Sequence, residues 1–299
     1  MMMNNLQKSA IANFISDPKL KLVKLNEQEY MEGHIAYRSQ QNEPEMILKA
    51  TFKVIEKHQS SQESYSILSI GCGSGLFEKP FLKKLIELNK SIHFVGIDPN
   101  KVECVKTEEW CHKLNRFQPD KFTFKIHPIK LEKFESSQSF DIILLIHSFY
   151  LFSEIESSFH KIYELLEEEG IVVIVIAIKT ELRELLYYVT QRLYQRSILL
   201  SDDLYQFFSE HNISVHQEII ESPLNITKCF QKDSQLGKHL LDFIVGANTT
   251  YFSPSQLQVL LDYLSSNSQK LEGGEIMIPT SVSLYYFQKQ KEEEIKKRN

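Results

Sequence analysis

The sequence has few of the residues that mark disulfide-rich or metal-binding proteins. Its 299 residues include only four cysteines, which is too few for a disulfide framework, so we expect reduced thiols. Cys111 is followed by His112, but Cys104 and His127 do not complete the paired ligand spacing of a zinc site. We therefore predict no metal centre.

Long apolar runs and long basic blocks are also missing. No run of about 18 apolar residues is present to span a bilayer, and residues 1–15 lack the continuous apolar core of a signal peptide. The formal charge is −5, and no basic block precedes the C-terminal KEEEIKKRN, which argues against nucleic acid or a membrane as partner. We expect a cytoplasmic protein with a small-molecule partner; the oligomeric state is open, with a monomer favoured.

Apolar residues are plentiful, at 42% of the chain, so a full core can form, most simply as one α/β domain with an added region. Strand and helix patterns alternate from residue 66, which predicts a mostly parallel sheet covered by helices on both faces. Two late strands at 214–220 and 280–288 are suited to an antiparallel hairpin at the sheet edge. The earlier predicted strands are 66–70, 92–97, 121–126, 140–146 and 171–178, with helices at about 76–89, 100–115 and 154–168.

The pattern divides the chain into four segments. Residues 1–60 are helical and precede the first sheet strand, so we interpret them as a lid or substrate segment. Residues 61–221 form the α/β core. Residues 222–275 carry two helical patterns and interrupt the late strands, so we place them on the substrate side. Residues 276–299 hold the last core strand and a charged tail.

A glycine-rich turn follows the first predicted strand, in the stretch SILSIGCGSGLFEK. Glycine permits positive φ and lets a ligand lie against bare backbone, while the next helix offers unpaired N–H groups. A dinucleotide fingerprint would have glycine or alanine where Leu76 stands, and a P-loop would end in Lys-Ser or Lys-Thr. Asp98 ends the next strand, 23 residues after Gly75, where it can accept hydrogen bonds from a ribose diol. The alternatives are a plain tight turn and a helix N-cap at Asp98.

The strand FDIILLI ends at Ile146, next to His147, at the edge of the sheet where open α/β folds bind ligands. With the G-x-G-x-G turn and Asp98, this arrangement resembles the class I S-adenosylmethionine-dependent methyltransferases, whose Rossmann-like sheet has seven strands and an antiparallel final hairpin. The resemblance implies S-adenosylmethionine as cofactor, the ribose at Asp98, Glu103 near the adenosine and Ile146 on the adenine side. It also places the methionine part of the cofactor against Gly71, Cys72, Gly73 and Gly75. For Glu103 the alternative is a solvated helix surface.

Further stretches are similar to histamine N-methyltransferase, in the same order and over residues 28 to 288. They are ILSIGCGSG, GIDPNKVE, FDIILLIHSFYLF, LLSDDLYQFFSEHNI, NITKCF, LLDFI and TSVSLYYF. If the similarity holds, the N-terminal helices and residues 222–275 together make the small-molecule pocket.

The stretch YMEGHIAYRSQQNE matches the N-terminal pocket segment of that family without a gap. It places Tyr30, His34 and Tyr37 on the substrate side and Glu43 at the amine-recognising carboxylate. A carboxylate there can pair with a cationic amine and orient its nitrogen; an ordinary helix-start glutamate is the alternative.

Two positions depart from the family. His147 and Thr280 stand where the family has amide-bearing residues, which leaves the acceptor open. His147 can hydrogen-bond a substrate or act as a base near neutral pH, or it can only pack in its loop. Thr280 is a candidate lining residue. Tyr150 belongs to a set of aromatics that suits a flat or cationic ligand but also suits a core; the others are Tyr187, Tyr188, Tyr194, Phe230 and Tyr251.

Together these features predict methyl transfer from S-adenosylmethionine to a small amine or an imidazole-like nitrogen by in-line displacement. Glu43 and His147 are the candidates for binding or deprotonating the acceptor. One alternative is a non-catalytic binding or interaction protein with the same fold. The other is a methyltransferase that acts on protein or RNA, which the acidic charge balance disfavours.

Overall fold

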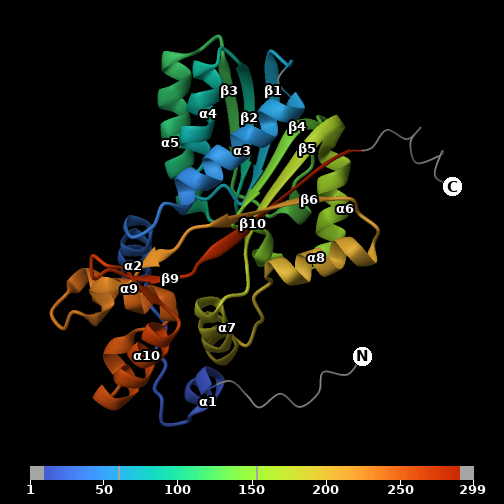
Figure 1. Cartoon of the computed structure of the whole chain (residues 1–299). Coiled ribbons are helices and arrows are strands. Elements are labelled where there is room, and N and C mark those ends of the chain that lie inside the picture. The colour runs from blue at the N-terminus through green and yellow to red at the C-terminus, as the bar shows by residue number, and fades with distance from the viewer. Residues whose placement is uncertain (1–9, 60, 153, 290–299) are drawn as a thin grey trace. The chain divides into compact units, whose positions relative to one another are not determined.

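The computed structural model describes residues 10–59, 61–152 and 154–289, and the chain forms two compact units (Figure 1). Residues 1–9 and residues 290–299, which belong to the predicted segment with the last strand and the charged tail, lie outside the described residues. The first unit gathers residues 1–43, 178–200 and 221–282, and the second unit gathers residues 44–177, 201–220 and 283–299.

The second unit is built on a seven-stranded sheet in the order β3-β2-β1-β4-β5-β10-β6. Neighbours among β1 to β5 pair in parallel and the sheet includes an antiparallel strand, so the predicted Rossmann-like fold class is confirmed. The strands β4 and β5 are almost wholly buried, as their continuous apolar runs predict. The strands are β1 (Ser64–Ile70), β2 (Ser91–Ile97), β3 (Phe122–His127), β4 (Phe140–Ile146), β5 (Leu166–Ala177), β6 (His216–Glu221) and β10 (Ser281–Gln288).

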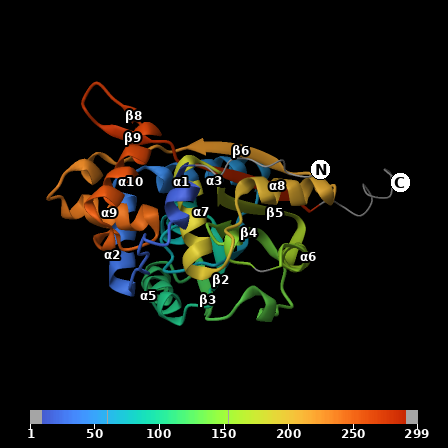
Figure 2. The same cartoon turned by 90° about the horizontal axis from the view of Figure 1, so that it is seen from below.

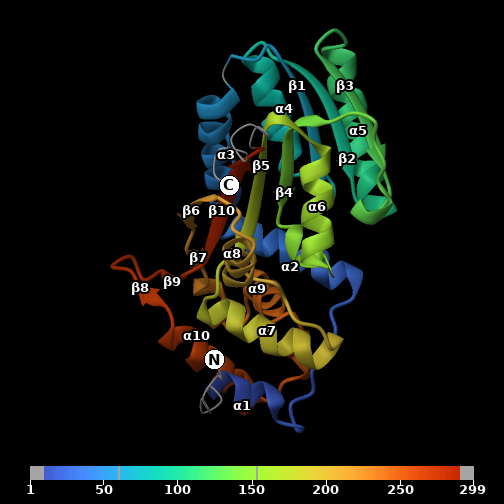
Figure 3. The same ribbon diagram turned by 90° about the vertical axis from the view of Figure 1, so that its right-hand side faces the viewer.

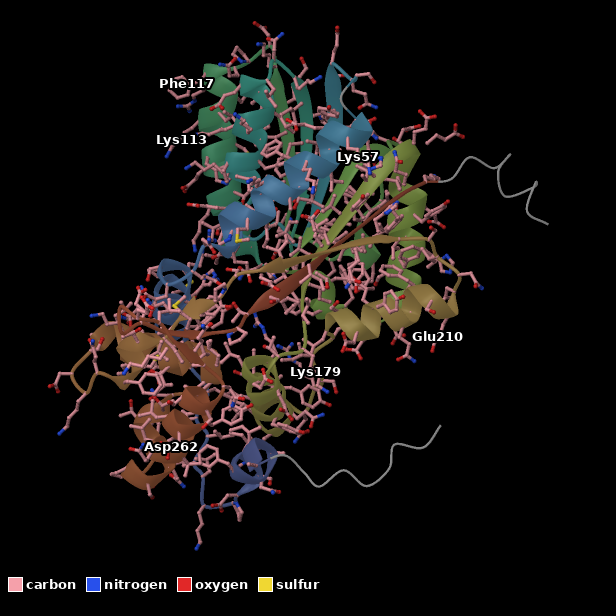
Figure 4. The ribbon with its side chains drawn as sticks, viewed as in Figure 1. Lys57, Lys113, Phe117, Lys179, Glu210 and Asp262 are labelled. Atoms are coloured by element: carbon pink, nitrogen blue, oxygen red, sulfur yellow. The ribbon has the colours of Figure 1, made fainter. Side chains whose placement is uncertain are left out.

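Helices cover both faces of this sheet. Figure 2 shows α3 and α5 on one face and α6 and α8 on the other. On α5, Lys113 and Phe117 lie one turn apart and point away from the sheet (Figure 4), while Trp110 and Cys111 are buried on the opposite side. The helices are α3 (Glu43–Gln59), α4 (Glu78–Glu87), α5 (Lys101–Phe117), α6 (Ile155–Leu165) and α8 (Ser201–Glu210).

The boundary between α6 and β5 differs from the predicted one. The sequence pattern extends the helix to residue 168 and begins the strand at 171, whereas α6 ends at Leu165 and β5 begins at Leu166. Leu166 is fully buried and pairs with Phe140 of β4, next to an irregularity in that ladder. Burial of this leucine in the sheet therefore outweighs the helical periodicity of the glutamates after it.

The first unit is mainly helical, and Figure 3 shows its helices α1, α7, α9 and α10. Two of its helices begin with a capping box, Asn26 with Glu29 and Ser253 with Gln256, which satisfies their first backbone N–H groups. The helices are α1 (Ala10–Ser16), α2 (Glu27–Ser39), α7 (Glu181–Tyr194), α9 (Gln235–Val245) and α10 (Pro254–Ser266). A small antiparallel sheet, absent from the sequence prediction, joins β7 (Leu224–Asn225), β9 (Ile276–Ile278) and β8 (Gln269–Lys270).

This unit has its own apolar core. Leu185 of α7, Leu240 and Val245 of α9 and Leu260 of α10 are fully buried in one cluster, which also contains residues of α1 and α2. Helices that are far apart in the sequence thus share one interior. No helix in the part of the chain that the structure describes has the length and apolar character to cross a membrane.

Candidate active site

The glycine turn follows β1, and the strand order in the sheet reverses on the two sides of β1. From β1 the chain moves outward to β2 and β3, and it then returns to β4 on the other side of β1. The carboxyl ends of β1 and β4 therefore flank a topological switch point, which is where open α/β sheets bind ligands. Gly71 follows β1 and His147 follows β4, so the sheet brings the two predicted loops to this edge.

All three glycines of the turn have positive φ, at 76° for Gly71, 51° for Gly73 and 73° for Gly75. A Cβ on Gly75 would lie 2.3 Å from Nε1 of Trp110, so only glycine fits there. A Cβ on Gly73 would meet no atom within 4 Å. The space beside the Gly73 α-carbon is therefore open to a ligand, whereas Gly75 is needed for packing.

The Asp98 carboxylate holds this turn from the end of β2. Its Oδ2 accepts a hydrogen bond from the Gly73 N–H at 3.0 Å, and its Oδ1 accepts one from the Asn100 N–H at 2.7 Å. A carboxylate offers about four acceptor sites, so capacity remains for ribose hydroxyls. The interpretation of Asp98 as the helix N-cap is wrong, because Asn100 caps α5.

The other side of the turn is tied to α5. The Thr107 hydroxyl donates to the Gly73 carbonyl at 2.7 Å, and the Trp110 indole donates to the Ser74 carbonyl at 3.2 Å. Glu103, in the first turn of α5, pairs with Lys106 at 2.5 Å and is half-buried. Its role near the adenosine stays a prediction.

Two buried titratable side chains lie around the turn. Cys72 is hydrogen-bonded to Cys104, and this bond together with burial raises the pKa of the Cys72 thiol. Glu78, in the first turn of α4, is 3% exposed and accepts a hydrogen bond from the Ser69 hydroxyl at 2.7 Å. Burial raises the pKa of Glu78 to about 7, while the Ser69 hydroxyl and backbone N–H groups oppose the rise. Nothing in the sequence pattern marks Glu78, because glutamates in the first turn of a helix are usually solvated.

The loop after β4 is bound to β1. The Ser148 hydroxyl donates to the Ile70 carbonyl at 2.5 Å, and a Cβ on Gly71 would lie 2.3 Å from the Ser148 Cβ. His147 has φ 54°, a left-handed conformation that is uncommon outside glycine and often found at functional sites. Ile146 and His147 are half-buried, and Tyr150 is exposed.

The predicted acceptor-side residues Tyr30, His34, Tyr37, Glu43 and Thr280 belong to the first unit. Three of them, Tyr30, His34 and Tyr37, line one side of α2 and surround the Phe243 ring of α9, with ring centroids 5.5, 5.6 and 5.1 Å away. Gly33 lets α9 approach, since a Cβ there would lie 2.8 Å from the Phe243 Cβ. Phe243 was not predicted, because its place depends on the packing of two helices distant in sequence.

The Tyr37 hydroxyl is the centre of a buried polar cluster. It accepts a hydrogen bond from Nη2 of Arg183 at 3.4 Å. The Thr280 hydroxyl donates to the Ser222 carbonyl. Burial raises the pKa of Tyr37, the Arg183 charge lowers it, the Glu43 charge raises it again, and the side chains of Thr280 and Gln41 beside it lower it. Glu43 is 5% exposed. The structure therefore brings Tyr37, Thr280 and Glu43 together, and it adds Arg183.

Comparison with known proteins finds a family model that matches part of the sheet-containing unit. Residues 68–172 match a family model described as a methyltransferase domain. This segment is therefore similar to methyltransferase domains. It runs from within β1 to within β5, and so includes the glycine turn, Asp98 and the loop after β4.

Solved structures share the fold of 80% to 94% of this chain. The YcgJ protein from Bacillus subtilis matches with a TM-score of 0.55 and 14% identity, over 80% of this chain and 97% of its own. The plantazolicin methyltransferases BpumL and BamL match with TM-scores of 0.50 and 16% identity, over 94% of this chain and 95% and 94% of their own. A search of curated protein sequences finds no match. The similarity to histamine N-methyltransferase therefore stays a prediction.

The cofactor that the similarity to methyltransferase domains implies is S-adenosylmethionine. The residues present fit it, because the space beside the Gly73 α-carbon is open and an acceptor-rich carboxylate, Asp98, lies next to this glycine. Among the described residues, no group of three or more histidine, cysteine or acidic side chains is arranged to hold a metal ion. All four cysteines are buried free thiols.

Proposed function

We propose that the protein transfers a methyl group from S-adenosylmethionine to a nitrogen of a small acceptor, an amine or an imidazole-like ring. The observation that carries the proposal is the open space beside the Gly73 α-carbon, next to the Asp98 carboxylate, at the carboxyl edge of the sheet. The plantazolicin methyltransferases support it further, because their fold covers both units of this chain and their structures hold S-adenosylhomocysteine with an azole-containing analogue.

The bound cofactor supplies a methyl group already activated on a sulfonium, so the protein has mainly to align the acceptor and exclude water. Asp98 would hold the ribose, and the Gly73 backbone would carry the methionine part. Glu43 would bind the acceptor amine through its carboxylate and accept its proton. His147 is the second candidate base, held at the end of β4 by its backbone hydrogen bond to Val175.

The test is methyl transfer from isotope-labelled S-adenosylmethionine to a panel of amines and imidazoles, with products identified by mass spectrometry. Glu43→Gln should raise the acceptor KM about tenfold or more, since a charge-assisted hydrogen bond is lost. The matched control is Glu45→Gln, because Glu45 is exposed one half-turn along the same helix. Turnover of no amine or imidazole by a protein that binds the cofactor would contradict the proposal.

A further inference from the structure

The polar cluster around the Tyr37 hydroxyl contains the guanidinium of Arg183, a residue outside all the stretches that resemble histamine N-methyltransferase. Arg183 lies in the first turn of α7, where its backbone N–H donates to the Thr180 N-cap at 3.3 Å. Its Nη2 reaches the Tyr37 hydroxyl of α2, 146 residues earlier in the chain. Arg183 thus meets the same side chain that Thr280 and Glu43 act on.

The charges of this cluster do not match a purely cationic guest. The cluster holds two guanidinium groups and one carboxylate. The charges of Arg183 and Glu43 both shift the pKa of Tyr37, and the Glu43 charge also shifts the pKa of Arg38. Arginine stays protonated at any ordinary pH. An acceptor that carries only an ammonium group would bring a third positive charge to one carboxylate. An acceptor that also carries an anion would bring no net charge.

The chemistry of the cluster favours a carboxylate as that anion. A guanidinium offers a planar fork of N–H donors that matches the two oxygens of a carboxylate. The hydroxyls of Tyr37 and Thr280 carry no charge, so two guanidinium groups and one carboxylate leave the cluster one positive charge in excess, which suits a monoanion. In the proposed function, Glu43 binds the amine at the other end of the same acceptor.

We propose that Arg183 is a specificity-determining residue that binds a carboxylate of the methyl acceptor, so that the acceptor is an amino-acid-like zwitterion. This inference rests on the proposed function and narrows its substrate class. It predicts that the enzyme prefers an amino acid over the amine formed by its decarboxylation, for the same side chain.

The test uses three matched pairs as probes: L-histidine and histamine, L-tyrosine and tyramine, L-tryptophan and tryptamine. Their affinities are measured by calorimetry on the full chain in the presence of excess S-adenosylhomocysteine. At least one amino acid should bind about tenfold or more tightly than its amine, and Arg183→Met should abolish that preference while it leaves the amine within about twofold. Arg183→Lys keeps the positive charge but loses the planar pair of N–H donors, so it should retain part of the preference for the amino acid over its amine. A partial preference in this variant would also show that the loss in Arg183→Met is not caused by misfolding. Arg196→Met is the matched control, because Arg196 is exposed just beyond the same helix.

Equal affinities within every pair, tighter binding of the amines, or no binding of any amino acid would overturn the inference. An equal loss for both members of a pair in Arg183→Met would also overturn it, since it would show a structural role. If any of these results is found while histamine or another amine is methylated, the proposed methyl transfer is supported and only the carboxylate-binding role of Arg183 is wrong. If neither cofactor binds and nothing is methylated, the proposed function itself fails.

Discussion

The buried Glu78 carboxyl makes the stability of the second unit depend on pH. Its pKa of about 7 compares with an ordinary value of 4.5, and burial is the main cause. Between these two values the folded state holds a proton that the unfolded state has released. The free energy of unfolding therefore falls as pH rises from about 4.5 to about 7. Above that range the protein has lost all of the stability that ionisation of the buried carboxyl removes. A difference of about 2.5 pH units corresponds to ~3 kcal/mol.

Glu78→Gln tests this value directly, because the amide has the same shape, can still accept the Ser69 hydrogen bond and never ionises. The variant should match the wild type near pH 4.5 and exceed its unfolding free energy by up to ~3 kcal/mol at pH 8. Urea unfolding at several pH values measures the difference, with fluorescence of the chain's single tryptophan, Trp110, as the probe.

The matched control is Glu87→Gln at the other end of α4, where the side chain is exposed and pairs with Lys84 at 3.8 Å. It should change stability by less than ~0.5 kcal/mol at every pH. A difference between Glu78→Gln and wild type that does not change with pH would refute the reasoning, as would a destabilised variant at pH 8.

Two further predictions concern the glycine turn and the first unit. Gly73→Ala should lower the free energy of unfolding by only ~1–2 kcal/mol, through left-handed backbone strain, yet weaken cofactor binding in calorimetry. Gly75→Ala should lower the free energy of unfolding by ~2 kcal/mol more, because Trp110 must move. Equal stability of the two variants in urea would contradict this. Arg192→Met should speed amide hydrogen exchange in α1, because the Arg192 guanidinium donates to the carbonyls of Ile15, Asp17 and Leu20 and such bonds contribute ~1.5–3 kcal/mol each. Unchanged hydrogen exchange in α1 would mean that the Arg192 hydrogen bonds do not stabilise the helix.

The sheet and its glycine turn could be predicted because their signals are local. Continuous apolar runs such as FDIILLI are what strands buried on both faces require, and the positive φ of Gly71, Gly73 and Gly75 is what glycine permits. The same holds for Asp98, whose place at the end of β2 follows from strand and turn alone. In the structure these residues lie at the ends of β1 and β2 as expected, and the Gly73 N–H donates to Asp98, a hydrogen bond that the sequence alone does not reveal.

The remaining site residues depend on tertiary packing. Arg183 meets Tyr37 across 146 residues, and Phe243 joins Tyr30, His34 and Tyr37 only because α9 packs on α2 at Gly33. No periodicity in the sequence carries this information. Glu78 is a second example, since its carboxyl is buried and accepts a hydrogen bond from the Ser69 hydroxyl of β1, which no sequence pattern indicates.

The central claim is that the glycine turn and Asp98 bind S-adenosylmethionine, and calorimetric titration of the full chain with S-adenosylmethionine and S-adenosylhomocysteine tests it most directly. We predict saturable one-to-one binding of both, and a loss of about tenfold or more in Asp98→Ala, since a charge-assisted hydrogen bond to the ribose is removed. Asp120→Ala, which changes an exposed aspartate in the same unit, should bind like wild type. Absence of binding to the wild type, or unchanged affinity in Asp98→Ala, would contradict the account.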